Sequence, residues 1–238
     1  MGLVIIGIEA LVLLGIMVAL LHKRDALTLV PFYMFVTMAF VYADIMASVA
    51  TIDFLGFTIT AGSVAPFCLI TIAFVWLYDV GGAKEAKRFY TSIVIIKFAM
   101  LAVIGLLLLK AAMILSPRSP FGADALSDIF VPNLRFTFFS LLAVVVELFL
   151  MLKLYAHFKR TMQNKYKFFQ VFVTVLVALW ADSLIFVGGS FAGDSAMGDI
   201  LAAHLVAKTF LAFLFAVVYL FAGMVLPLKR DAARPALK

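Results

Sequence analysis

Charged residues are scarce in this sequence, and their scarcity excludes a protein that folds in water. Asp, Glu, Lys and Arg make up only 13% of the 238 residues, whereas hydrophobic residues make up 66%. Typical globular chains carry about 25% charged residues, and no segment here is long and polar enough to form a separate soluble domain. We therefore predict a single transmembrane domain over residues 1–228, followed by a basic cytoplasmic tail over residues 229–238.

Cysteine and histidine are also rare. The single cysteine, Cys68, excludes an intrachain disulfide and a paired-cysteine metal site. The three histidines, His22, His157 and His204, are widely separated, and no nucleophile–base pair is visible. We therefore expect no enzyme, no metal site and no cofactor. The net charge is +6, but the basic residues lie in short connections, so they report topology and we expect no nucleic-acid partner.

Long apolar runs, by contrast, are abundant. About 20 consecutive apolar residues cross the hydrocarbon core of a bilayer. The runs predict an all-α integral membrane bundle of seven transmembrane helices, near residues 3–21, 27–49, 58–79, 90–114, 132–157, 167–189 and 200–226. The first run has basic residues after it and none before it, so we interpret it as a helix and not as a cleaved signal peptide.

The basic residues predict the orientation of these helices. Lys and Arg concentrate in the connections 22–25, 81–88 and 157–167 and in the tail, whereas the alternate connections hold mostly Asp. Basic connections face the cytoplasm, so we predict an external N-terminus and a cytoplasmic C-terminus. The long connection 116–132 would then be external, and its Pro and Gly predict that it is not helical.

Several ionisable side chains lie inside the apolar runs, where each is a functional-site hypothesis by default. Those well inside the runs are Glu9, Asp44, Glu147, Asp182, His204 and Lys208, with Arg135 near the outer start of its helix. Asp79, Lys97, Lys110 and Lys153 lie nearer helix ends, from which their side chains can extend to the membrane surface.

Depth brings four of these groups into one layer. Counting about 1.5 Å per residue, Asp44, Asp182, Lys208 and Glu9 each lie roughly 8–12 Å below the outer ends of their helices. His204 lies one turn above Lys208 on the same face. Such a layer suits an outward-opening pocket for a polar ligand.

The alternative is a purely structural role. Lys208 could form an ion pair with Asp182 or Asp44 that joins helices, because opposite charges offset each other's desolvation. His204 could pack with a hydrogen bond instead of binding ligand. Glu147 lies deeper and is either a protonatable coupling group, with Glu9 as a second candidate, or a neutral structural acid.

Residues 54–91 (FLGFTITAGSVAPFCLITIAFVWLYDVGGAKEAKRFYT) resemble the queuosine-precursor transporter family, also called the vitamin-uptake transporter (VUT) family. The resemblance continues at Asn133-Leu134-Arg135 with Ser140, in the stretch 180–186 (WADSLIF), at 191–193 (FAG) and at Lys208, and it covers residues 27–226. It implies uptake of a small heterocyclic metabolite across the cell's inner membrane. Glu147 and Asp182 favour a proton as the coupling ion, and sodium stays open. The resemblance also implies that Arg135, Asp182 and Lys208 line the pocket, with Asp44 where the family often has asparagine.

This sequence departs from the family at three places. Val75 and Met151 stand where the family has acids, and an additional helix precedes the shared six. Asp79 follows Val75 by one turn and is the candidate to replace the first of these acids. The two lost acids leave open a different ligand, or sensing in place of transport.

Two other functions remain open. A seven-helix photoreceptor or light-driven pump would carry retinal on Lys208, with Asp182 or Asp44 as counter-ion and Trp180 and Trp76 lining the polyene. A membrane sensor or assembly subunit is the third hypothesis. The expected partners are a small-molecule substrate and the lipid bilayer, and a homo-oligomer is compatible with the sequence.

Overall fold

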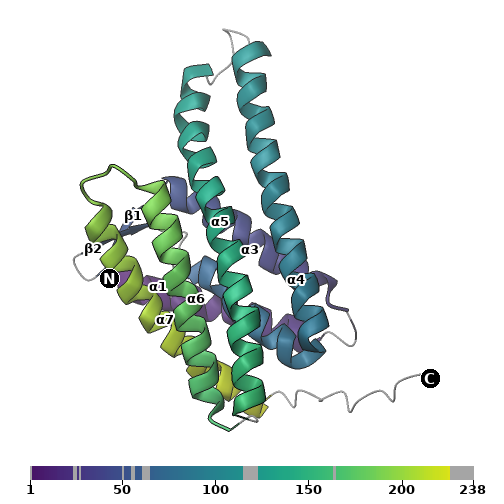
Figure 1. The fold of residues 1–238 in the computed structure, drawn as a ribbon. Helices are drawn as coiled ribbons and strands as arrows, with labels where there is room; N and C mark the ends of the chain where they lie inside the picture. Colours follow the sequence, from purple (N-terminus) through teal and green to yellow (C-terminus); the bar gives the residue numbers. More distant parts are fainter. Residues whose placement is uncertain are drawn as a thin grey trace.

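The computed structural model describes residues 2–23, 26, 28–49, 51–54, 57–60, 65–114, 123–162 and 165–225. The predicted basic tail, 229–238, and part of the predicted connection 116–132 lie outside these residues. The described elements are α1 (Gly2–His22), α3 (Val30–Val49), β1 (Thr51–Phe54), β2 (Phe57–Thr60), α4 (Ala65–Ile114), α5 (Ala123–Thr161), α6 (Lys167–Ser190) and α7 (Met197–Val225). Figure 1 shows α5, α6 and α7 side by side, with the second part of α4 next to α5.

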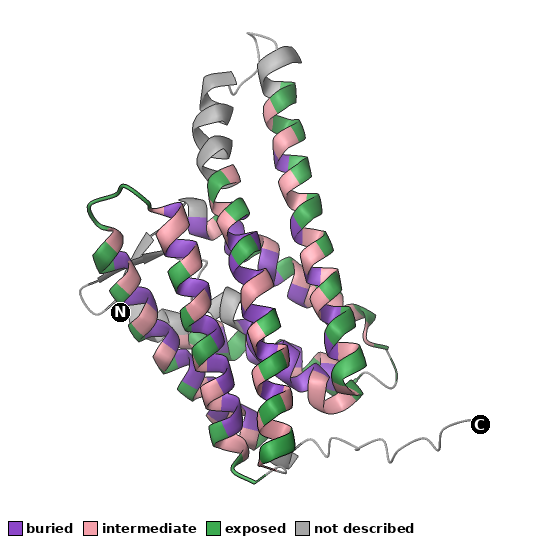
Figure 2. Cartoon of the chain, in the orientation of Figure 1, coloured by how far each residue is buried: buried purple, intermediate pink, exposed green. Residues whose placement is uncertain are grey.

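The helices are suited to a bilayer. In the part of the chain that the structure describes, five helices are long and apolar enough to cross a membrane, namely α3, α4, α5, α6 and α7, and α1 carries a shorter apolar stretch. Large apolar side chains such as Leu106, Met34 and Phe221 are exposed, as expected where lipid is the solvent. Figure 2 shows exposed residues on the outward faces and buried ones toward the middle. The chain is therefore a multi-pass membrane protein.

The third and fourth predicted helices follow each other within α4, with a break at Gly82 between them. α4 has 50 residues, which is about 75 Å of helix and far more than the roughly 30 Å of a hydrocarbon core. Its backbone leaves the helical region at Gly82 (φ 72°, ψ −172°), a conformation that is essentially restricted to glycine. The predicted connection 81–88 is therefore wrong: a one-residue break separates a first limb, 65–81, from a second limb, 83–114 (Figure 1).

Two other helix boundaries differ from the prediction. The helix expected from residue 58 begins at Ala65, because Phe57–Thr60 pairs antiparallel with Thr51–Phe54. Both strands are rich in threonine and isoleucine, which favour extended backbone. The second boundary is the start of α5, which begins at Ala123 and contains Pro132. The expectation that proline keeps this segment non-helical is therefore wrong. Proline is tolerated in membrane helices where neighbouring groups satisfy the freed backbone.

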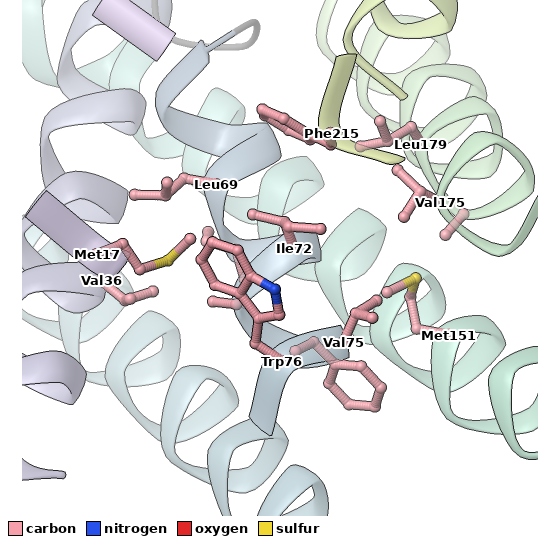
Figure 3. Close-up of a cluster of buried hydrophobic side chains, with 14 of the residues drawn as sticks. Met17, Val36, Leu69, Ile72, Val75, Trp76, Met151, Val175, Leu179 and Phe215 are labelled. Atoms are coloured by element: carbon pink, nitrogen blue, oxygen red, sulfur yellow. The ribbon is translucent and has the colours of Figure 1, made fainter. Parts of the chain in front are cut away.

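The first limb of α4 is the centre of the core. Every residue from Leu69 to Leu77 is buried, and a helix that is apolar on all faces is expected to be surrounded by others. Figure 3 shows its side chains between residues of α1 and α3 on one side and residues of α5, α6 and α7 on the other: Leu69, Ile72, Val75 and Trp76 lie among Met17, Val36, Met151, Val175, Leu179 and Phe215. The other helices are thus arranged around this limb.

Candidate functional site

Two ion pairs lie in the interior of the bundle. The ammonium of Lys97 on the second limb of α4 pairs with the carboxylate of Asp44 on α3. The ammonium of Lys208 on α7 pairs with the carboxylate of Asp182 on α6. All four residues are at most 5% exposed. An isolated charge there would cost several kcal/mol, so each lysine requires its carboxylate.

Ser140 on α5 joins the first pair. Its hydroxyl accepts a hydrogen bond from Lys97 Nζ at 2.7 Å and donates one to Asp44 Oδ1 at 3.0 Å. The Lys97 ammonium also lies 4.0 Å from the centre of the Phe40 ring, which adds a cation–π contact. Three helices therefore hold the first ion pair.

The two ion pairs are close enough to influence each other. The charge of Asp182 acts on Lys97, and the charges of Lys97 and Asp44 act on Asp182. We call Asp44, Lys97, Ser140, Asp182 and Lys208 the paired-charge cluster. With both lysines protonated and both aspartates ionised, the cluster has no net charge, which reduces its desolvation cost.

Glu147 on α5 borders this cluster. Its Oε1 accepts a hydrogen bond from Thr71 Oγ1 at 2.5 Å, and it interacts electrostatically with Asp182 and Lys208. Among the described residues, Glu147 Oε2 and Asp182 Oδ1 are buried acceptors without a hydrogen-bond partner. An unsatisfied buried polar group costs about 1–3 kcal/mol, so these two oxygens are the places where a proton or a ligand donor would be stabilised.

His204 lies beside the cluster on α7. Its ring is fully buried, stacks on Phe186 with 6.2 Å between centroids, and is within electrostatic reach of Lys208 one turn away. The structure therefore brings together five sequence-predicted residues, Asp44, Glu147, Asp182, His204 and Lys208. In the described part of the chain, no three His, Cys, Asp or Glu side chains gather as a metal site.

Lys97 is an interior charge that the hydropathy pattern does not predict. It was expected to extend toward a membrane surface, but it is completely buried. The error follows from the position of the helix start: the second limb begins at residue 83 and not at 90, so Lys97 lies about 21 Å along it. Had the break at Gly82 been recognised, the same depth count would have placed Lys97 among the interior charges.

Arg135 and Glu9 are placed elsewhere. The exposed guanidinium of Arg135 donates to the carbonyl oxygens of Gly189 (2.9 and 3.3 Å) and Ala192 (3.1 Å) at the end of α6. A Cβ at Gly189 would overlap the ring of Phe139, so glycine allows α5 and α6 to approach closely there. Arg135 also borders a cavity of about 600 Å³ with Ser190 and Phe191. Glu9 on α1 is partly buried, and it is not among the described groups that act on either ion pair.

A second polar group, the Asp79 cluster, joins other parts of the same helices. Asp79, at the end of the first limb of α4, accepts hydrogen bonds from Lys159 Nζ of α5 (2.6 Å) and from the hydroxyl of Tyr219 of α7. The Lys159 ammonium lies 5.2 Å from the centre of the Tyr78 ring, and the Tyr155 and Tyr219 hydroxyls are 3.5 Å apart. Asp79 lies three residues before the break at Gly82, and its carboxylate is bound by residues of two other helices.

A multi-pass helical bundle with paired charges in its interior is the class of protein that this fold and site define. The model of the vitamin uptake-like sensor (VUPS) family matches residues 14–221, and the chain belongs to this family. No curated protein and no solved structure was found to match the chain. The match confirms a vitamin-uptake-like character, and the queuosine-precursor substrate stays a prediction.

Proposed function

We propose that this protein is a membrane sensor that binds a small polar, vitamin-like ligand at the paired-charge cluster. The single observation that carries the proposal is the convergence of Asp44, Lys97, Ser140, Asp182 and Lys208, from α3, α4, α5, α6 and α7, on one buried region. The membership of the vitamin uptake-like sensor family supports it.

The chemistry of the cluster suits a heterocycle with donors and acceptors on one edge. Such a ligand would donate to Asp182 Oδ1 and Glu147 Oε2, two of the buried acceptors that have no hydrogen-bond partner among the described residues. A carboxylate or carbonyl of the ligand would compete with Asp182 for Lys208. Breaking or weakening the Asp182–Lys208 pair alters the attraction between α6 and α7, so ligand binding would shift the arrangement of these two helices.

The change would reach the Asp79 cluster through shared helices. α5 and α7 each carry a residue of the paired-charge cluster and a residue of the Asp79 cluster. The first limb of α4 carries Asp79 and also Thr71, which donates to Glu147 beside the paired-charge cluster. A displacement of α7 at Lys208 therefore alters the position of Tyr219 relative to Asp79. Two arrangements of these contacts would be the two states that a sensor needs.

Uptake is the second candidate function. The same cluster would bind a transported metabolite, and Glu147 would carry the coupling proton because its Oε2 is buried without a hydrogen-bond partner in the described part of the chain. Labelled ligand in proteoliposomes separates the two functions. A transporter accumulates the ligand above the equilibrium level when a proton gradient is imposed, whereas a sensor binds it stoichiometrically without accumulation.

The first experiment is a thermal-stability screen of the purified protein with vitamins and 7-deazapurines. A ligand at 100 times its Kd adds about 2.7 kcal/mol of apparent stability. We expect one class to raise the Tm of the parent and to have no effect on Asp182→Asn. The control is Lys153→Gln, a change at an exposed lysine of α5, which should respond like the parent. Equal stabilisation of Asp182→Asn and the parent would place the ligand outside the cluster.

A further inference from the structure

A groove between α3 and the second limb of α4 is separate from the paired-charge cluster. The two helices run side by side in the same direction. The Tyr33 hydroxyl donates to Glu85 Oε1 at 2.7 Å, and the Asp44–Lys97 pair joins the helices further along both of them. The groove between these contacts has a volume of about 1130 Å³.

The two ends of the groove differ in chemistry. Lys84, Lys87 and Arg88 line the end next to the break at Gly82. The part further from the break is lined by apolar side chains, among them Met34, Met38 and Ile96. Met34 and Met38 are 68% and 64% exposed, so their side chains face the surroundings of the bundle and not its interior.

The basic end has positive charge in excess. Glu85 is the one acid in the lining, and its carboxylate already accepts from Tyr33 and, at 3.2 Å, from Arg88 Nη1. The Arg88 side chain is 63% exposed, so its other guanidinium N–H groups are open to a further acceptor. Basic residues at a membrane surface attract anionic headgroups by about 1 kcal/mol each.

We propose that this groove binds an anionic phospholipid. Its phosphate would lie at Lys84, Lys87 and Arg88, and an acyl chain would follow Met34, Met38 and Ile96. The α4 residues that line the groove run from 84 to 96, which is about 18 Å of helix, close to the roughly 15 Å of hydrocarbon in one leaflet. Charge at one end and apolar length at the other match the two parts of one lipid.

The test is lipid binding by the purified full-length protein, measured by native mass spectrometry after delipidation. The probes are phosphatidylglycerol, phosphatidylcholine and glycerol phosphate. The variant is Lys84→Gln/Lys87→Gln/Arg88→Gln, and the matched control removes three exposed charges outside the groove: Lys110→Gln/Lys153→Gln/Arg160→Gln. We expect the parent and the control to prefer phosphatidylglycerol over phosphatidylcholine at least fivefold, and the variant to lose this preference.

The other outcomes would overturn the proposal. Equal binding of both lipids by the parent, or an undiminished preference in the charge variant, excludes a headgroup site at these residues. Competition by glycerol phosphate at equal concentration would show that a free phosphate compound occupies the site instead of a lipid. If the charge variant does not fold, Met34→Trp/Met38→Trp provides a second test, because it narrows the apolar part of the groove. We expect this variant to lose the preference for phosphatidylglycerol that the parent shows, and an undiminished preference would overturn the proposal.

A second copy of the chain is the other conceivable occupant. If the parent is a dimer that Met34→Trp/Met38→Trp dissociates and the charge variant leaves intact, the groove is an interface between two copies and the lipid proposal is wrong. Lipid binding in the groove and ligand binding at the paired-charge cluster are tested independently. Asp182, which is replaced in the ligand experiment, is not among the residues that line the groove.

Discussion

Lys208 of α7 and Asp182 of α6 form an ion pair inside the bundle, and both side chains are almost completely buried. Removing one partner of a buried ion pair strongly destabilises a protein, whereas replacing both partners by apolar residues often changes the stability little. The pair therefore behaves as one unit, and the same is expected of Lys97 and Asp44.

Removing one member of the pair should destabilise the protein more than removing both. Lys208→Met leaves the Asp182 carboxylate buried without its lysine, and we expect a loss of about 3–5 kcal/mol in the free energy of unfolding. Asp182→Leu/Lys208→Met should restore most of that loss. Unfolding in detergent, followed by circular dichroism, measures both. Lys153→Met, at an exposed position, should change stability by less than about 0.5 kcal/mol.

Neutralising Glu147 should separate sensing from proton-coupled uptake. Glu147→Gln keeps the shape of the side chain and the oxygen that accepts from Thr71. A neutral amide has no charge to desolvate, so we expect the free energy of unfolding to change by no more than about 1 kcal/mol. Ligand-induced stabilisation should weaken, because the amide nitrogen in the place of Oε2 cannot accept a hydrogen bond from the ligand. Accumulation of ligand by the parent under an imposed proton gradient, and its absence in this variant at saturating ligand, would favour a transporter in which Glu147 carries the proton.

The break in α4 should depend on glycine at residue 82. Gly82→Ala forces a side chain into a conformation that costs about 1–3 kcal/mol, and we expect a loss of that size because the backbone there has φ 72°. The control is Gly105→Ala in the second limb, where a Cβ would have open space. That change should be neutral or stabilising by up to about 1 kcal/mol. Equal effects of the two substitutions on Tm would contradict the requirement for glycine.

Contacts of the Asp79 cluster should hold α4, α5 and α7 together. Lys159→Met and Tyr219→Phe each remove a hydrogen-bond donor to Asp79, and Tyr219→Phe should cost about 1 kcal/mol. We expect faster amide hydrogen exchange in residues 79–86 for both variants. Lys165→Met, at an exposed residue in the connection after α5, is the matched control. Unchanged exchange in Lys159→Met would show that this cluster does not restrain the break.

Retinal addition should produce no visible absorption band. The Lys208–Asp182 ion pair is compatible with a Schiff-base lysine and its counter-ion, so the expectation rests on the position of Trp180. Trp180, expected to line a polyene pocket, is 43% exposed and donates to Thr209 Oγ1 at 3.1 Å. An absorption spectrum after adding all-trans retinal, with Lys208→Ala as control, provides the test. A band that hydroxylamine bleaches and the variant lacks would establish a Schiff base and a photoreceptor or pump.

The sequence by itself determined the membrane class and most of the interior charges. Apolar runs of about 20 residues leave few alternatives to membrane helices. An ionisable side chain within such a run must face other helices, which is why Asp44, Glu147, Asp182, His204 and Lys208 could be named from the sequence. The uptake-like family was also recognisable from motifs spread over the chain, and the family match confirms that level of the prediction.

Only the tertiary structure decided which charged residues pair with each other and where some of the helices begin and end. Sequence spacing gives depth along a helix but not the rotation of one helix against another, so it could not choose between Asp182 and Asp44 as the partner of Lys208. Lys97 was misplaced because a single residue, Gly82, separates the two limbs of α4, whereas the sequence pattern indicates a longer connection. The strands at 51–54 and 57–60 form because they pair with each other. Such pairing depends on both segments together, so the hydropathy of one segment alone does not predict it.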